Sequence, residues 1–210
     1  MTVFTYSENL PGNEDEQKAL IELWKESWSK RGWRPEVLGR EHAQDNPRFS
    51  VFRDRIASFP TVNTRDYEDV CWLRWLAFEQ VGGGIIVDAD VINYSLRPED
   101  FVVEVCASHD ASGSSGFVSA SAEGARSLVT RILTLPEGDC VVSRAGRPHI
   151  SDMFVVAKYV PPSGCQCCRV YSWPRWFECP CVHYANATLW RDFPQDWPHK
   201  APSIRRLREL

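Results

Sequence analysis

A run of glycines leads directly into a short apolar stretch that ends in two carboxylates. Gly82–Gly84 precedes Ile85–Val87, which is followed by Asp88, Ala89 and Asp90. Glycines allow a tight turn and close backbone approach, and an apolar β-branched run after such a turn predicts a buried strand. Because side chains alternate across a strand, Asp88 and Asp90 should point to the same side, with only the small Ala89 between them.

Two carboxylates at one point are suited to a divalent cation. Mn²⁺ and Mg²⁺ take oxygen ligands and are often completed by substrate phosphates. We therefore expect Mn²⁺ or Mg²⁺ at Asp88 and Asp90, together with a phosphorylated partner such as a nucleoside diphosphate. The alternative is structural, since Asp is also common where a strand ends in a turn and at helix caps.

The segment before the glycines has helical periodicity. Its apolar positions recur at three- and four-residue steps, at Val70, Leu73, Ala77 and Val81. Arg74 lies at the edge of this stripe, where a guanidinium needs an anionic partner. We expect Asp88, Asp90 or a bound ligand to be that partner.

These features occur in a fixed order: an arginine on a helix, a glycine pair, an apolar strand and a D-x-D motif, at Arg74, Gly82–Gly83 and Asp88/Asp90. This order resembles the sugar-nucleotide site of GT-A fold glycosyltransferases. It is most similar to the group with a DXD sugar-binding region, which includes the fungal initiating mannosyltransferases and the clostridial glucosylating toxins. Those proteins typically read D-x-x-R, G-G and D-x-D, whereas this chain has Cys71 at the first aspartate, so Asp69 or Asp66 would have to substitute for it.

The resemblance implies which residues contact the nucleotide sugar and its metal. The donor contacts would be Thr5, Tyr6, Arg74, Gly83, Asp88, Ala89, Asp90 and Lys200. Thr5 and Tyr6 end the first expected strand, where the family receives the base, although an ordinary strand end is an equal alternative. Lys200 would offset the charge of the departing diphosphate. The resemblance favours transfer with retention of configuration.

The resemblance also implies a late histidine that completes the metal shell, and His183 is the candidate, ahead of His199. Its alternative is a core or surface histidine, and Asn186 lies close enough in sequence to reach the same ion. A transferase that inverts configuration needs a group to take the acceptor's proton. Asp152 and His149 are the candidates, although Asp152 or Ser151 can equally begin a helix as its N-cap.

Strands and helices alternate along the chain. We expect strands at 3–6, 36–38, 85–87, 101–106 and 117–120, and helices at 14–31, 46–57, 66–80 and 123–133. This order predicts an α/β fold with ligands at the carboxyl ends of its strands. His109 and Asp110 in the polar loop at 108–116 are candidates for a sugar contact, and simple solvation is the alternative.

With the resemblance, the α/β order implies a GT-A-like, Rossmann-type mixed sheet flanked by helices, in a single domain over residues 1–210. Its nucleotide-sugar-binding half would span residues 1–110. The acceptor- and metal-completing half would span residues 111–210 and contain a cysteine cluster at 165–181.

That cluster has five thiols in a short segment, at Cys165, Cys167, Cys168, Cys179 and Cys181. Four thiolates can hold a structural Zn²⁺ ion, although C-x-C spacing is less usual than C-x-x-C. Free buried thiols are the alternative.

The composition favours one globular domain: the 210 residues are 43% hydrophobic and 25% charged. A net charge of −4 argues against broad electrostatic capture of nucleic acid. No apolar stretch approaches the roughly 20 residues that span a bilayer, and the first residues lack a secretion signal. We therefore expect a cytoplasmic protein with reduced cysteines.

Together these patterns predict a metal-dependent glycosyltransferase that moves a sugar from a nucleoside-diphosphate sugar, with UDP as the expected nucleotide, to an acceptor hydroxyl. Two alternatives remain open. A nucleotidyltransferase would use the same metal and nucleotide but normally needs a further carboxylate cluster and a basic phosphate loop. A zinc-containing module that binds nucleic acid or protein would use the cysteines and the basic run at 205–208.

Overall fold

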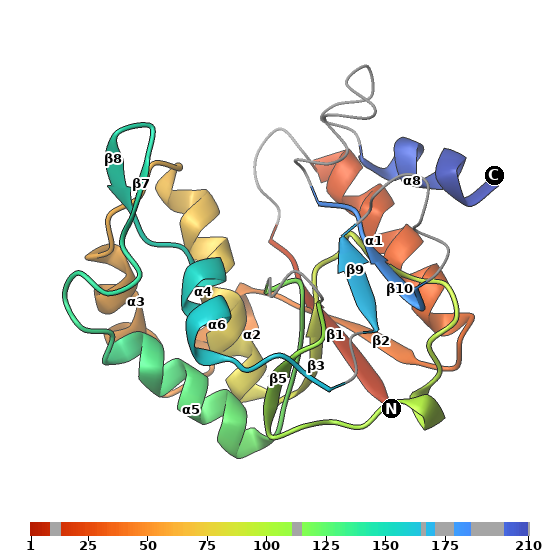
Figure 1. Ribbon diagram of the computed structural model, residues 1–210, viewed down its shortest axis with the longest axis horizontal. Helices are drawn as coiled ribbons and strands as arrows, with labels where there is room; N and C mark the ends of the chain where they lie inside the picture. The colour runs from red at the N-terminus through yellow and green to blue at the C-terminus, as the bar shows by residue number, and fades with distance from the viewer. Residues whose placement is uncertain (9–13, 111–114, 165–166, 171–178, 186–199, 210) are drawn as a thin grey trace.

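A five-stranded mixed sheet organises the chain (Figure 1). The computed structural model describes residues 1–8, 14–110, 115–164, 167–170, 179–185 and 200–209. The strand order is β2-β1-β3-β6-β5, with β1 at Thr2–Tyr6, β2 at Arg34–Leu38, β3 at Gly84–Val87, β5 at Cys106–Ser108 and β6 at Phe117–Ala120. β1 is parallel to both β2 and β3, whereas β6 is antiparallel to β3 and to β5. The predicted mixed α/β fold is confirmed at this level.

Helices cover both faces of this sheet, and Figure 1 shows α1 and α8 on one side and α3 to α6 on the other. The helices are α1 at Glu14–Ser29, α2 at Arg40–Gln44, α3 at Phe49–Ala57, α4 at Arg65–Gln80, α5 at Ala122–Leu133, α6 at Asp152–Tyr159 and α8 at Lys200–Glu209, with a 3₁₀ turn η1 at Pro98–Asp100. None of the helices in the described part of the chain has the length and apolar character that a bilayer-spanning helix requires.

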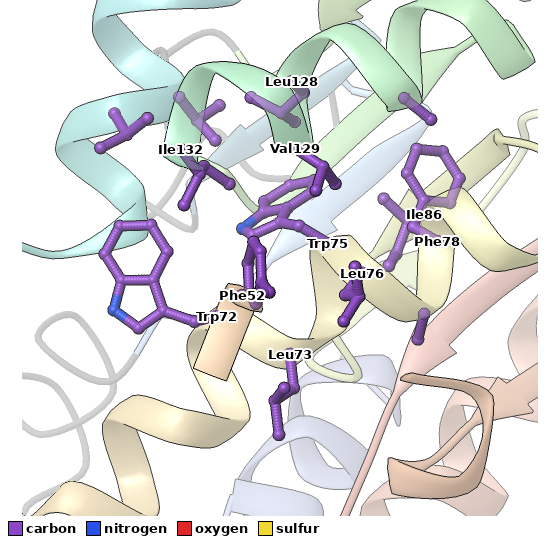
Figure 2. Close-up of a cluster of buried hydrophobic side chains, with 14 of the residues drawn as sticks. Phe52, Trp72, Leu73, Trp75, Leu76, Phe78, Ile86, Leu128, Val129 and Ile132 are labelled. Carbon is purple, nitrogen blue, oxygen red and sulfur yellow. The ribbon is translucent and has the colours of Figure 1, made fainter. Parts of the chain in front are cut away.

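The alternation of side chains along β3 divides the core in two. Ile86 faces the larger cluster, which Figure 2 shows between α4 and α5, with Trp72, Trp75 and Val129 among its members. Ile85 and Val87 face the opposite cluster, where Trp24, Trp28 and Trp33 of α1 and the turn after it pack on the sheet. β3 is therefore buried on both faces, as its uninterrupted apolar run predicts.

The chain leaves the large sheet at the two aspartates and enters a second, three-stranded sheet. Its order is β4-β10-β9, with β4 at Val91–Asn93, β10 at Cys181–His183 and β9 at Cys168–Val170. β10 is antiparallel to β4, and the register pairs His183 with Val91. A separate hairpin joins β7 at Val142–Arg144 to β8 at Arg147–His149. The small sheet thus brings the late part of the chain beside the end of β3.

The glycine turn between α4 and β3 is a conformational requirement. Gly82, Gly83 and Gly84 all have positive φ, at 83°, 77° and 115°. A Cβ atom on Gly83 would lie 2.5 Å from the Ala120 carbonyl oxygen, so a larger residue cannot fit there.

Most expected elements are present with boundaries shifted by a few residues, but the strand predicted at 101–106 is wrong. Residues 101–104 have no regular structure, and the strand begins only at Cys106. Val102 and Val105 are 77% and 70% exposed, so their β-branched side chains do not pack on a sheet. Strand propensity largely reflects such packing, and here the packing is missing.

Candidate metal centre

Backbone hydrogen bonds fix Asp88 and Asp90 at the junction of the two sheets. The Asp88 amide donates to the Gly116 carbonyl oxygen at 2.9 Å, and the Val91 amide donates to the Asp88 carbonyl oxygen at 2.9 Å. The Tyr184 amide donates to the Asp90 carbonyl oxygen, also at 2.9 Å. Both sheets therefore hold this short turn, which limits the positions that the two carboxylates can take.

His183 joins the two aspartates from β10. Its Nε2 atom lies 3.6 Å from Asp88 Oδ2 and 3.4 Å from Asp90 Oδ1. Within the described ranges, these three residues are the only group of three or more Asp, Glu, His or Cys whose ligand atoms all lie within 4.8 Å of one another. The prediction that Asp88, Asp90 and His183 come together is confirmed, whereas a metal bound there stays a prediction.

The separations among these atoms suit a shared cation. Two ligand atoms about 2.1 Å from an ion at right angles lie about 3 Å apart, slightly closer than the distances found here. Carboxylate oxygens and an imidazole nitrogen form a donor set that transition-metal ions accept. The Asp88 side chain is 31% exposed while those of Asp90 and His183 are each 9% exposed, so the group is open on the Asp88 side.

Asp110 and Gly116 confine the His183 ring from its other edge. Asp110 Oδ2 lies 2.9 Å from His183 Nδ1. A carboxylate accepts hydrogen bonds, so Nδ1 carries the hydrogen and Nε2 is directed at Asp88 and Asp90. A Cβ atom on Gly116 would lie 2.6 Å from Cε1 of the ring, so only glycine leaves room for the imidazole. Asp110 is buried and contacts His183, whereas the sequence suggested a solvated or sugar-contacting loop residue.

The expectation of an anionic partner for Arg74 is confirmed, and there are two such partners. Arg74 Nη1 donates to Asp88 Oδ1 at 2.5 Å, and Nη2 donates to Asp152 Oδ2 and to Ser115 Oγ. Trp75 Nε1 donates to the same Asp152 oxygen at 3.1 Å. Burial opposes the charge on Arg74, but Asp152 and Asp88 raise the pKa of its guanidinium above the usual value. Arg74 thus links α4, the end of β3 and the start of α6.

Lys200 reaches the opposite side of the site from the start of α8. Its Nζ atom donates to Asp90 Oδ2 at 2.5 Å. The Ala201 amide donates to Glu16 Oε1 at 2.8 Å, and Ala201 and Ile204 are buried. The docking of α8 therefore positions the ammonium group against Asp90.

The charges of the site favour a further cation. Among the described residues, four carboxylates, at Asp88, Asp90, Asp110 and Asp152, lie with the permanently charged cations Arg74 and Lys200. Burial alone would lower the pKa of His183, but Asp90, the hydrogen bond to Asp110, and Asp88 raise it to about 9. The imidazolium thus supplies part of the missing positive charge, and a divalent cation would supply more.

The two aspartates differ in their proton affinity. Burial raises the pKa of Asp88, and Arg74 only partly offsets that effect. Burial would also raise the pKa of Asp90, but Lys200 and His183 hold it below the usual value. Of these two carboxylates, Asp90 is therefore the one whose ionised form the surrounding protein stabilises more.

A pocket of about 310 Å³ opens at the carboxyl ends of β1 and β2. It is lined by Ser7, Glu8, Val37, Leu38, Gly39, Arg40 and Glu41. Tyr6 donates to Glu8 Oε1, and Arg40 Nε donates to Glu8 Oε2 at 2.8 Å. Burial and the hydrogen bond to Glu8 raise the pKa of Tyr6, which keeps its hydroxyl protonated. Thr5, expected here as a donor contact, is fully buried one residue earlier.

Two expected site residues lie away from this group. Gly83 lies directly before β3, at the opposite end of the strand from Asp88, where the nearby Ala120 carbonyl oxygen leaves no room for a Cβ atom. His149 is fully buried, and its Nδ1 accepts a hydrogen bond from the Val62 amide while Nε2 lies 4.0 Å from Glu68 Oε1. The contacts of both residues are thus made elsewhere in the fold.

A structural zinc ion at the cysteine cluster stays a prediction. Cys168 and Cys181 are register partners on β9 and β10, and Cys167 and Cys179 are buried nearby in sequence. Burial raises the pKa of Cys168 well above the usual value, so its thiol stays protonated without a metal. Cys165, Asn186 and His199 lie outside the described residues.

Sequence reasoning did not identify Ser115, Trp75 or Gly116 as part of this site. Ser115 and Trp75 support Arg74 and Asp152, and Gly116 leaves room for the His183 ring. The glycines and serines of the loop at 112–116 resemble those of any polar loop. A serine followed by a glycine directly before a strand is common in loops of every kind, so this pattern did not predict a role for Ser115 or Gly116.

The fold and site define a mixed α/β protein with a carboxylate and imidazole cluster at the carboxyl edge of its sheet. Residues 3–102 match the model of a family described as a domain of unknown function (DUF8765). This match includes Arg74, Asp88 and Asp90 but ends before Asp110 and His183. Neither a curated protein nor a solved structure matches the chain.

Proposed function

We propose that this protein is a metal-dependent glycosyltransferase that moves a sugar from a nucleoside-diphosphate sugar to an acceptor hydroxyl. The observation that carries the proposal is the convergence of Asp88, Asp90 and His183 at the carboxyl end of β3. Mn²⁺ or Mg²⁺ bound there would neutralise charge that develops on the leaving diphosphate. The remaining support comes from the sheet topology and the pocket at the carboxyl ends of β1 and β2.

The sheet order supports a nucleotide at this edge. In open α/β sheets, ligands bind outside the carboxyl ends of strands where the strand order reverses. In the order β2-β1-β3 this point lies between β1 and β3. Phe4 pairs with Ile86 in the parallel register, so Tyr6 and Asp88 stand opposite each other two residues later. The antiparallel β6 beside β3 is also compatible with the GT-A-like, single-domain arrangement that we propose.

The pocket beside Tyr6 is suited to the nucleoside part of the donor. Among the described residues that line it, the charged side chains are those of Glu8, Glu41 and Arg40. Such a pocket favours a neutral group rich in hydrogen-bond donors, such as a ribose or a base, over a phosphate. A donor with its nucleoside here and its diphosphate at Asp88 and Asp90 would follow the edge of the sheet.

The sugar would lie on the open side of Asp88. Tyr67 is 45% exposed on the helix that carries Arg74, and Cys71, burial of the hydroxyl and Asp152 raise its pKa. Tyr67, Cys71 and Arg74 follow one face of α4. Asp152 accepts hydrogen bonds from Arg74, Trp75 and the Met153 amide, so we assign it to holding Arg74, rather than to taking a proton from the acceptor.

The test is thermal stability against UDP, GDP and their sugars, with and without Mn²⁺, for the wild type and Asp90→Ala. A ligand at 100 times its Kd adds about 2.7 kcal/mol, which raises the melting temperature by about 5–10 °C in a chain of this size. We expect this rise only with metal, its loss in Asp90→Ala, and its retention in the matched control Asp54→Ala, which removes an exposed carboxylate of α3. Metal-dependent release of free nucleoside diphosphate from the stabilising sugar nucleotide then tests transfer or hydrolysis.

A different result would redirect the assignment. If no nucleotide stabilises the protein with any metal while a zinc chelator unfolds it, the cysteine-centred binding module replaces the transferase. Stabilisation by nucleoside triphosphates with release of pyrophosphate would instead favour the nucleotidyltransferase.

A further inference from the structure

We infer that Asp110 is a positioning residue for the metal centre, which fixes the ring and the tautomer of His183 so that Nε2 faces the cation. The inference rests on the metal site of the proposed function, but it does not depend on sugar transfer. Asp110 lies outside the D-x-D motif and beyond the residues that match the family model. Its contact with His183 assigns it a role at this site.

The first support is that Asp110 is buried and its backbone is fixed by neighbouring strands. Its side chain is 0% exposed and lies between the two sheets. Its backbone pairs with Cys168 in an isolated parallel bridge, and the Cys168 amide donates to the His109 carbonyl oxygen at 3.1 Å. The carboxylate is therefore attached both to the end of β5 and to β9, the strand beside the one that carries His183.

The second support is the geometry around the imidazole. Asp110 Oδ2 holds Nδ1 at 2.9 Å on one edge, while Nε2 lies within 3.6 Å of Asp88 and Asp90 on the other. A Cβ atom on Gly116 would lie 2.6 Å from Cε1, so the ring occupies the space beside the Gly116 backbone. The ring is held in one orientation before any cation arrives.

The chemical consequence follows from the two nitrogen atoms of histidine. A metal binds the nitrogen without a hydrogen, and the hydrogen bond made by the other nitrogen decides which one that is. With Asp110 accepting from Nδ1, the neutral ring presents the Nε2 lone pair to Asp88 and Asp90. Without Asp110, the ring is free to carry its hydrogen on Nε2, which then repels a cation.

This role predicts a difference between metals. An imidazole ligand suits transition-metal ions better than Mg²⁺, which prefers oxygen and keeps several waters. A misplaced His183 ring should therefore lower the affinity for Mn²⁺ and Co²⁺ more than the affinity for Mg²⁺. A general loss of negative charge, or a loss of folding, would lower the affinity for all three ions alike. The ratio of Mn²⁺ to Mg²⁺ affinity therefore distinguishes a positioning role of Asp110 from these two effects.

The experiment measures Mn²⁺ affinity from the electron paramagnetic resonance signal of free Mn²⁺, and Mg²⁺ affinity by competition, on the full chain. Asp110→Ala should lose about 10–100-fold in Mn²⁺ affinity, as outer-shell partners of ligating histidines commonly do. The loss of Mg²⁺ affinity in this variant should be smaller. Asp110→Asn keeps an acceptor and should lose less than Asp110→Ala.

Ser119→Ala is the matched control, because Ser119 is fully buried and its hydroxyl lies 2.8 Å from Nε2 of the adjacent His109. It removes a buried hydrogen bond from the same segment and should leave both metal affinities unchanged. If Asp110→Ala does not fold, the ratio of Mn²⁺ to Mg²⁺ affinity in Asp110→Asn carries the test. An unchanged ratio in the variants overturns the inference, whereas failure of the wild type to bind metal overturns the metal site itself.

Discussion

Lys200 Nζ lies 2.5 Å from Asp90 Oδ2, although the two residues stand 110 positions apart in the sequence. This contact joins the first residue of α8 to the turn between the two sheets. Lys200 and a metal cation would compete for the same carboxylate group. When a diphosphate is present, the ammonium has a second anion to meet on the same side.

Removing Lys200 should therefore change two affinities in opposite directions. In Lys200→Ala, we expect Mn²⁺ to bind about 5–10-fold more tightly without nucleotide, because Asp90 loses a competing charge-assisted hydrogen bond. The affinity for nucleoside diphosphate with metal should fall by a similar factor. Isothermal titration with each ligand measures both changes.

Lys30→Ala is the control for that variant, since Lys30 pairs with Glu26 in an exposed ion pair on α1. It should change neither affinity. A fall in both affinities for Lys200→Ala would mean instead that Lys200 acts by holding α8 in place.

Metal binding should release a proton from His183. The pKa of this residue is about 9 in the metal-free protein, since Asp90, Asp110 and Asp88 outweigh the effect of burial. A cation needs the neutral ring, so metal affinity should rise up to about tenfold per pH unit below pH 9 and level off above it. Calorimetry at pH 7.5 in buffers of different ionisation enthalpy should detect about one released proton. His183→Gln should bind the metal more weakly and release no proton on binding.

The same pKa shift affects the stability of the metal-free protein with the opposite sign. The usual value of 6.5 applies to the unfolded chain, and the folded value is about 9. The stabilisation from protonated His183 is therefore fully present below about pH 6.5 and is lost as the pH rises through 9. Urea unfolding at several pH values should reveal this loss in the wild type but not in His183→Gln.

The local half of the site was predictable from sequence. The spacing of Asp88 and Asp90 on a strand end fixes their common direction, because side chains alternate with a period of two residues. The helical position of Arg74 predicted an anionic partner, which the structure identifies as Asp88 and Asp152. These predictions depend only on periodicity and on the cost of burying an unpaired charge.

The other half depends on contacts between distant elements, which periodicity does not encode. Asp110 and His183 meet only because the two sheets pack at the end of β3, and a polar loop gave no signal of that burial. His149 was predicted as a candidate base for the acceptor, but it is buried and its Nδ1 accepts a hydrogen bond from the Val62 amide. The strand misassigned at 101–106 shows the same limit, since exposure overrides the preference of valine for strands.

Gly124 should tolerate no side chain, although it lies in a helix. Replacing a helical glycine with alanine usually stabilises a protein by up to about 1 kcal/mol. Here the new Cβ would lie 1.7 Å from the Val105 carbonyl oxygen, so the helix or that backbone must move. We expect Gly124→Ala to destabilise the fold by about 1–3 kcal/mol in urea unfolding.

Gly164→Ala is the matched control for that change, because within the described part of the chain its new Cβ would have no heavy atom within 4 Å beyond its chain neighbours. It should be neutral or stabilising by about 0.4–1 kcal/mol. Equal effects of the two substitutions would show that the contact between α5 and Val105 does not limit stability.

Arg74 should be more important for folding than any surface arginine. Arg74→Met leaves Asp88 and Asp152 without their shared cation, and breaking such a buried pair costs about 3–5 kcal/mol. Arg53→Met, on the exposed side of α3, should stay within about 0.5 kcal/mol of the wild type. Because Asp88 then loses the positive charge of Arg74, Mn²⁺ should stabilise Arg74→Met against urea by more than it stabilises the wild type. Equal stabilisation of the two proteins would mean that the cation and Arg74 do not share Asp88.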